Sequence, residues 1–240
     1  MIYITKKELG DDYGMRGVSP IGKEWFEQAD FFEQYVVGKT LADIEGMTLD
    51  EQGHPTDADL LTGVTMKIGA WQTALVKAIK TAVPVNASAS DSLGLGIVST
   101  GYGSKDAADG EDGACSVSSS MAAVTVNAEG VITAAYIEAG EGKFTFDGEG
   151  KITSDTEAGV LTKRELHDDY GMKPVSPIGK EWYEQADAMG AYVIGKTADE
   201  VAGIAVDEAG KPTDADLLTG VTITANGFRD AIVKAVENAK

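Results

Sequence analysis

The chain contains one segment twice, and this duplication constrains its fold more than any other feature. Residues 4–78 (the first repeat) align with residues 161–235 (the second repeat) without a gap, at a constant offset of 157 positions. Of the 75 aligned pairs, 45 are identical, and residues 55–65 return unchanged as 212–222. Two repeats indicate a duplicated module and not a solenoid, which needs about three or more units.

Each repeat is expected to contain two main helices separated by a polar loop. In the first repeat, Ser19-Pro20 is typical of a helix cap followed by a helix-starting proline. Apolar residues then recur with a period close to 3.6, and Gly38 is expected to end this helix. The polar segment 50–55 predicts a loop. A second helix is predicted at about 68–81, and its equivalent at about 224–238.

The composition changes between the repeats. Residues 82–92 are rich in Pro, Ala and Ser, which is typical of a linker. Residues 93–152 contain short β-prone runs on either side of two turn-like segments, 127–130 and 147–150. This pattern predicts an antiparallel strand block.

The order of these segments predicts an α+β protein in which the helical half is duplicated. Residues 1–81 form a helical half-repeat, 82–92 a linker, and 93–240 a complete domain. The complete domain combines the strand block 93–152 with the second helical repeat, 161–238. The strands of the first half are either absent from this chain or supplied by the shared central block.

The first half-repeat presents a large apolar helix face that must be covered. Exposing the apolar area of its aromatic side chains to water costs free energy. These side chains are Trp25, Phe26, Phe31 and Phe32. No strand block precedes the helix. We therefore expect it to pack against residues 93–152 or against a second molecule, which makes a homo-oligomer through the N-terminal repeat one of the two expectations.

Composition excludes several function classes. The net charge of −19 argues against nucleic-acid binding, which needs clustered Lys and Arg. No run of 18 apolar residues occurs, so no membrane insertion is expected. The single cysteine, Cys115, excludes an intramolecular disulfide and cysteine-based metal clusters. His54 and His167 have no partner histidine nearby in sequence, and no catalytic residue or metal site is predicted.

The most informative motif is Asp-Leu-Leu-Thr-Gly-Val-Thr, which precedes the second predicted helix of both repeats. Its glycine permits close backbone approach, and the N-terminus of a helix favours a phosphate group. A threonine at that point could bear the phosphate. The alternative is that Thr65 and Thr222 are ordinary helix N-caps.

This motif resembles that of the FMN-binding domain family found in sodium-pumping quinone reductases and Rnf-type electron-transfer complexes. In that family Asp, two residues, Ser or Thr, Gly, Ala, and Thr or Ser precede a helix, and the final hydroxyl carries FMN through a phosphoester. Both repeats depart from the motif at one position, where Val replaces Ala. The matching residues are Asp59, Thr62, Gly63, Val64 and Thr65 in the first repeat, and Asp216, Thr219, Gly220, Val221 and Thr222 in the second.

The resemblance implies an FMN-binding-domain-like fold that holds FMN at Thr222, and at Thr65 if the first repeat also has a pocket. It further implies a secreted electron-transfer module at the surface of a bacterium or outside it, with a membrane or extracellular redox partner. No leader is visible in this chain. Such a module is a redox carrier more than an enzyme with its own substrate. The valine at positions 64 and 221 keeps a second hypothesis open, a non-flavin binding or structural module of a bacterial surface protein that retains the fold.

Overall fold

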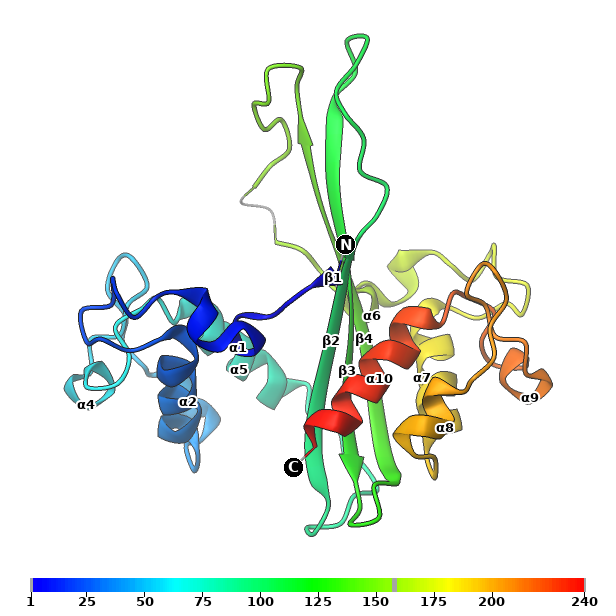
Figure 1. Cartoon of the computed structure of the whole chain (residues 1–240), viewed down its shortest axis with the longest axis horizontal. Coiled ribbons are helices and arrows are strands. Elements are labelled where there is room, and N and C mark those ends of the chain that lie inside the picture. Colours follow the sequence, from blue (N-terminus) through cyan, green and yellow to red (C-terminus); the bar gives the residue numbers. More distant parts are fainter. Residues whose placement is uncertain (1, 157–158, 240) are drawn as a thin grey trace. The chain divides into compact units, whose positions relative to one another are not determined.

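The computed structural model describes residues 2–156 and 159–239, which form two compact units (Figure 1). The larger unit comprises Met1–Tyr3 and Val85–Lys240, and the smaller unit comprises Ile4–Pro84. The division at Pro84 falls inside the predicted linker, 82–92. Each unit contains one repeat, and the larger unit also contains the strand block. Among the described residues, no helix has the length and apolar character needed to cross a bilayer.

The larger unit is built on an antiparallel sheet with the strand order β1-β2-β3-β4. The strands are β1 (Ile2–Tyr3), β2 (Ser92–Gly101), β3 (Gly113–Val126) and β4 (Ile132–Phe146). The turn between β3 and β4 forms where predicted, because the Asn127 side chain accepts hydrogen bonds from the backbone of Glu129 and Val131. The predicted mixture of helices with antiparallel strands is confirmed.

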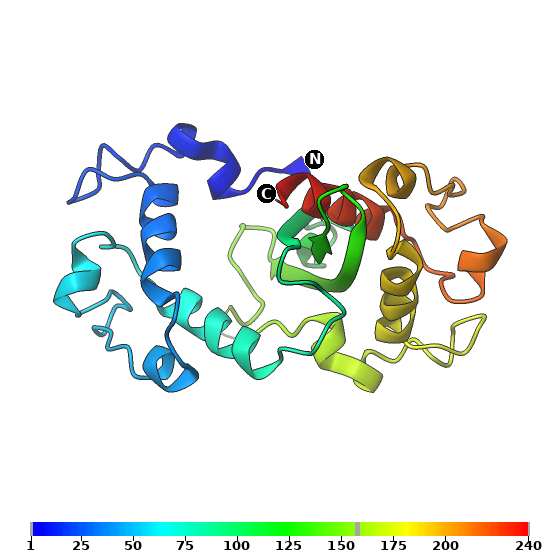
Figure 2. The same cartoon turned by 90° about the horizontal axis from the view of Figure 1, so that it is seen from below.

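Helices of the second repeat cover one face of this sheet. The helix α10 contacts β2 and β3, and α7 contacts β4; Figure 2 shows both helices beside the sheet. Trp182, Met189, Phe228 and Ile232 join strand residues such as Val124 in one buried core. The helices of this unit are α6 (Lys163–Leu166), the 3₁₀ helix η2 (His167–Tyr170), α7 (Trp182–Val193), α8 (Ala198–Ala202), α9 (Ala215–Leu218) and α10 (Asn226–Asn238).

Two glycines let α10 lie directly on β2. A Cβ atom added to Gly94 or Gly96 would lie less than 3.0 Å from the backbone oxygen of Ala235 or Ala231, respectively. Two side chains of α10 then reach edge carbonyls of β2. Lys234 Nζ donates to Ile97 O at 2.9 Å, and Asn238 Nδ2 donates to Leu95 O at 3.0 Å. Side chains of the helix therefore supply the hydrogen-bond donors that a neighbouring strand would otherwise supply to β2 at this edge.

The smaller unit repeats the same series of helices at the offset of 157 residues. Its core contains Phe32, Leu60, Val64 and Ile68, with Trp71 packed against them. The helices are α1 (Lys6–Leu9), the 3₁₀ helix η1 (Gly10–Tyr13), α2 (Trp25–Val36), α3 (Leu41–Glu45), α4 (Ala58–Leu61) and α5 (Gly69–Lys80). A common backbone trace for both repeats stays a prediction, for which superposition of the two segments is the measurement.

The predicted start of the first main helix is wrong in both repeats. The sequence places it at Ser19-Pro20, whereas α2 begins at Trp25 behind the N-cap Glu24. Gly22 adopts a left-handed conformation with φ of 63°, which ends the turn at Ser19 before a helix can form. The same holds for Ser176-Pro177 in the second repeat, where α7 begins at Trp182. The predicted second helices, 68–81 and 224–238, are confirmed as α5 and α10.

Candidate functional site

The Thr-Gly-Val-Thr motif does not open the long helix that follows it. Thr65 and Thr222 each lie four residues before the first residue of α5 or α10, and the N-caps of those helices are Ile68 and Ala225. The predicted phosphate site at a helix N-terminus is therefore wrong, and so is the alternative that these threonines are N-caps. A short loop separates them from the helix. Their role in ligand binding stays a prediction.

The first half of the motif forms the short helices α4 and α9. Asp59 and Asp216 lie in the first turn, while the caps are the preceding aspartates, Asp57 and Asp214. The hydroxyl of Thr62 donates to Asp59 O at 2.7 Å, and the equivalent bond of Thr219 to Asp216 O has the same length. The two threonine hydroxyls therefore hold the backbone of the motif in place, and the two aspartates accept these bonds through their backbone oxygens.

The glycine and valine of the motif have packing roles. A Cβ atom on Gly220 would lie 2.7 Å from Ala188 Cβ on α7, and one on Gly63 would enter the ring of Phe31 on α2. Val64 and Val221 are 0% exposed. Val221 belongs to the core of the larger unit, so its branched side chain fills the core instead of standing over the neighbouring Thr222 hydroxyl.

A buried glutamine connects the motif to the loop before the main helix. Gln185 Oε1 accepts hydrogen bonds from the Thr222 backbone N–H at 2.9 Å and from the Thr222 hydroxyl at 3.3 Å. Its Nε2 donates to Ser176 Oγ and Lys180 O, both at 3.3 Å. Gln28 makes the equivalent backbone bond to Thr65 at 2.9 Å. The sequence analysis missed both glutamines. A signal was available, because the same polar residue stands on an otherwise apolar helix face in both repeats.

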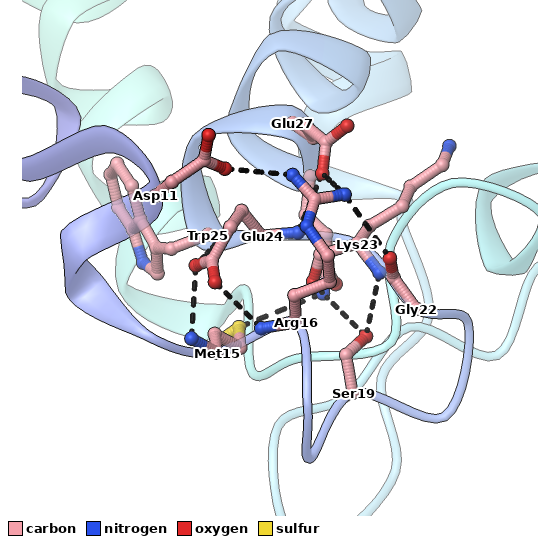
Figure 3. Close-up of polar contacts among 10 residues, drawn as sticks. Asp11, Met15, Arg16, Ser19, Gly22, Lys23, Glu24, Trp25 and Glu27 are labelled. Carbon is pink, nitrogen blue, oxygen red and sulfur yellow. Dashed lines mark hydrogen bonds and ion pairs between the residues drawn. The ribbon is translucent and has the colours of Figure 1, made fainter.

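A buried glutamate also holds the loop before the main helix, and Figure 3 shows it in the first repeat. The Glu24 carboxylate accepts backbone hydrogen bonds from Arg16 at 2.7 Å, Met15 at 3.0 Å and Trp25 at 3.1 Å. The bond from Arg16 is the main reason why the pKa of Glu24 is lowered, against the opposing effect of burial. Arg16 also pairs with Glu27 at 2.8 Å. In the second repeat, Glu181 receives the equivalent backbone bonds from residues 172 and 173.

These bonds predict a pH-dependent contribution of Glu24 to the stability of the smaller unit. Because the folded state lowers the pKa of Glu24, its contribution is complete above the unfolded pKa, near 4.5. The contribution is lost as pH falls through the folded pKa. The melting temperature of Glu24→Gln should therefore lie below that of the wild type at pH 7, and the gap should narrow below about pH 4.5. An equal gap at pH 7 and at pH 3, measured by circular dichroism, would contradict this assignment.

Thr222 lines a hollow of about 400 Å³ in the larger unit. Its wall combines two lysines and three hydroxyl side chains with an apolar surface. The lining residues are Lys163, Met172, Val175, Ser176, Pro177, Trp182, Lys211, Thr222, Ile223 and Thr224. The hollow thus joins the end of the motif to α6, the start of α7 and the loop that contains Lys211. A hollow of about 340 Å³ in the smaller unit lies beside Tyr35, Lys39 and Asp57 and contains none of the predicted site residues.

Lys163 is the more buried of the two lysines at this hollow. It forms an ion pair with Glu141 of β4, and its Nζ lies 4.9 Å from the centre of the Tyr170 ring. Burial disfavours its charge, but hydrogen bonds with Glu141 and Tyr170 outweigh burial, and the pKa of Lys163 is raised. Lys211 is exposed and stands at the position that His54 occupies in the first repeat. Both lysines line the same hollow as Thr222, and the charge of Lys163 is paired with that of Glu141.

The two histidines and the cysteine considered in the sequence analysis make contacts that indicate a structural role or lie at the surface. His54 pairs with Asp50 at 3.0 Å, and His167 stacks on Tyr183 with ring centres 3.9 Å apart. Cys115 is exposed on β3. Within residues 2–156 and 159–239, no group of His, Cys, Asp or Glu is arranged to hold a metal ion.

Comparison with known proteins gives one partial similarity. No family model matches the chain, and no solved structure matches it. A segment is 43% identical over 67 residues to the chlorophenol reductase of Desulfitobacterium hafniense. The match covers 23% of this chain and 20% of that protein, so the chain spans about one fifth of this relative's length.

Proposed function

We propose that the larger unit binds FMN in the hollow around Thr222 and acts as an electron-transfer module outside the cytoplasm. One observation carries the proposal: the last hydroxyl of the motif lines a hollow together with two lysines and apolar side chains. The protein would position and tune the flavin, while the flavin carries the electrons.

The lining of the hollow supports the proposal with a charged group for a phosphate and apolar groups for a ring. Lys211 offers a charged donor to a phosphate, whereas Lys163 is already paired with Glu141. Met172 and Ile223 offer apolar surface to a planar ring. Its volume of about 400 Å³ lies within the range of about 300–1,000 Å³ that is usual for small-molecule sites.

Thr222 is the residue that we propose carries the FMN phosphate as an ester. Ser176 and Thr224 also present hydroxyls to the hollow, but only Thr222 occupies the final position of the motif. Gln185 accepts a hydrogen bond from its hydroxyl and so fixes the direction of the Oγ atom. Thr65 lies at the equivalent position of the first repeat, and its use as a second flavin site is part of the same proposal.

A second candidate function is a structural or non-flavin binding module of a bacterial surface protein. It is favoured by the packing roles of the motif, since Gly220 contacts α7 closely and Val221 lies in the core. A motif retained for packing alone would keep these residues without a flavin.

The remaining parts of the proposal are the surface or extracellular location and the redox partner. The partial relative is named a reductase, which places one similar segment in a redox enzyme. Because the match covers 20% of that enzyme, its activity on chlorophenol is not assigned to this chain.

The proposal predicts a preference for FMN over riboflavin, because only FMN carries the phosphate. In a titration followed by flavin fluorescence, FMN should bind the wild type more tightly than riboflavin. Lys211→Glu should weaken FMN binding about tenfold, as expected for the loss of one charged hydrogen bond, and leave riboflavin almost unchanged. Lys151→Glu, a charge reversal at an exposed turn, is the matched control. Equal affinities for both flavins, unaffected by Lys211→Glu, would contradict the phosphate site.

A further inference from the structure

The hollow of the larger unit has a positive charge that its neighbours hold in a fixed place. Lys163 forms an ion pair with one carboxylate oxygen of Glu141, and the Tyr102 hydroxyl donates to the other at 2.9 Å. The Lys163 Nζ atom also lies 4.9 Å from the centre of the Tyr170 ring and 5.9 Å from that of the Trp182 ring. The ammonium group is therefore fixed beside two aromatic side chains, one of which, Trp182, lines the hollow.

The surroundings of this ammonium group screen its charge only weakly. The Lys163 side chain is 14% exposed, and Trp182 is 3% exposed. Burial disfavours the charged form, but hydrogen bonds with Glu141 and Tyr170 outweigh burial, so the raised pKa keeps Lys163 protonated at neutral pH. A charge away from water acts more strongly on its neighbours than a charge in water. Lys163 lines the hollow and Glu141 does not, so the ion pair presents its positive member to a ligand.

Attachment of α6 to the sheet does not account for this lysine. Lys6 stands at the position of Lys163 in the first repeat. Its Nζ atom lies 5.0 Å from the centre of the Tyr13 ring and 5.5 Å from that of the Trp25 ring, the equivalents of the two rings near Lys163. Lys6 makes these contacts within the smaller unit, whereas β4 belongs to the larger unit. The lysine beside two aromatic rings is thus a property of the repeat itself.

We propose that Lys163 raises the reduction potential of the flavin in the hollow by stabilising the negative charge that the flavin ring gains on reduction. This inference rests on the proposed FMN site. Charges near the ring of a bound cofactor tune its electronic properties, while a redox partner supplies the electrons. Lys163 keeps its proton and acts through its charge alone. Glu141 opposes the effect, because its negative charge disfavours the reduced flavin.

The test measures the reduction potential of the full chain loaded with FMN, by equilibration with a dye of known potential. Lys163→Met should lower the potential by about 30 mV or more, which for two electrons is a tenfold loss of preference for the reduced flavin. Glu141→Gln should raise the potential, and the double variant should fall between the two single variants. Lys143→Met is the matched control, because it removes an exposed lysine from the strand that carries Glu141, and it should leave the potential unchanged.

The opposite signs of the two single variants separate a charge effect from a change of structure. A lysine that only holds α6 in place would give both variants the same sign or no shift. Comparing Glu141→Gln with the double variant removes the lysine charge without leaving a buried charge unpaired, which protects the test against misfolding of Lys163→Met.

A second measurement uses the protein without flavin. The melting temperatures of the wild type, the two single variants and the double variant form a double-mutant cycle, and the two losses should be less than additive because both remove the same ion pair. Additive losses overturn the inference. So does a Lys163→Met potential equal to that of the wild type, or a shift of the same sign in both single variants, while the proposed FMN site then stands. A wild type that takes up no FMN overturns both.

Discussion

Gly94→Val is expected to lower the melting temperature of the larger unit by about 6–12 °C. A Cβ atom at this position would lie less than 3.0 Å from Ala235 O, and the obstructing atom belongs to the backbone of α10. The helix must therefore move away from β2, which also removes the Asn238 bond to Leu95 O. Overpacking of this kind costs about 3 kcal/mol, and a unit of this size loses about 2–4 °C for each kcal/mol.

Differential scanning calorimetry checks this expectation, because it can follow the transitions of the two units separately. Gly148→Ala is the control, since nothing lies within 4 Å of a Cβ atom added there. Its melting temperature should stay close to that of the wild type. If Gly94→Val also melted with the wild type, the direct contact between α10 and β2 would be wrong.

Local sequence signals were sufficient for most of the secondary structure. The second helix predicted in each repeat corresponds to α5 and α10, and the turn at 127–130 located the hairpin of β3 and β4. The start of α2 was missed because Ser19 is used differently from a cap. Its hydroxyl accepts bonds from Lys23 N and Gln28 Nε2, which stabilise a turn in place of a helix. Pairing of β1 with β2 was also missed, since Ile2 and Thr100 are far apart in sequence.

The candidate site was only partly accessible from the sequence. The motif identified Thr222, but Lys163 and Lys211 come from separate segments and meet only in the folded unit. Lys211 was also difficult to recognise as a site residue from the sequence, because the equivalent residue of the first repeat is His54. The glycine of the motif suggested access for a phosphate and the valine suggested an obstacle to it, whereas tertiary packing places the glycine against α7 and the valine in the core.

The core position of Val221 changes what restoring the family motif would do. Val221→Ala removes buried methyl groups and leaves a cavity, which destabilises the larger unit by about 1 kcal/mol or more. It does not open the hollow, because Val221 is outside its lining. The valine is thus compatible with both proposed functions, and the hydroxyl of Thr222 is the feature that distinguishes them.

Thr222→Val is expected to abolish covalent flavin attachment to the larger unit. Valine has nearly the shape of threonine but no oxygen with which to form a phosphoester. The backbone N–H of residue 222 can still donate to Gln185, so the loop should keep its position. Thr65→Val in the first repeat is the matched control. In this variant the larger unit should still carry flavin.

Intact mass spectrometry after co-expression with a bacterial flavin transferase tests the proposed function most directly. A known flavin-accepting domain, expressed in parallel, establishes that the transferase is active. We expect the wild type to gain the mass of FMN less one water. Thr65→Val should keep an adduct, and Thr222→Val should lose the adduct from its larger unit. An unmodified wild type beside a modified acceptor, or an adduct on the larger unit that survives Thr222→Val, would contradict it.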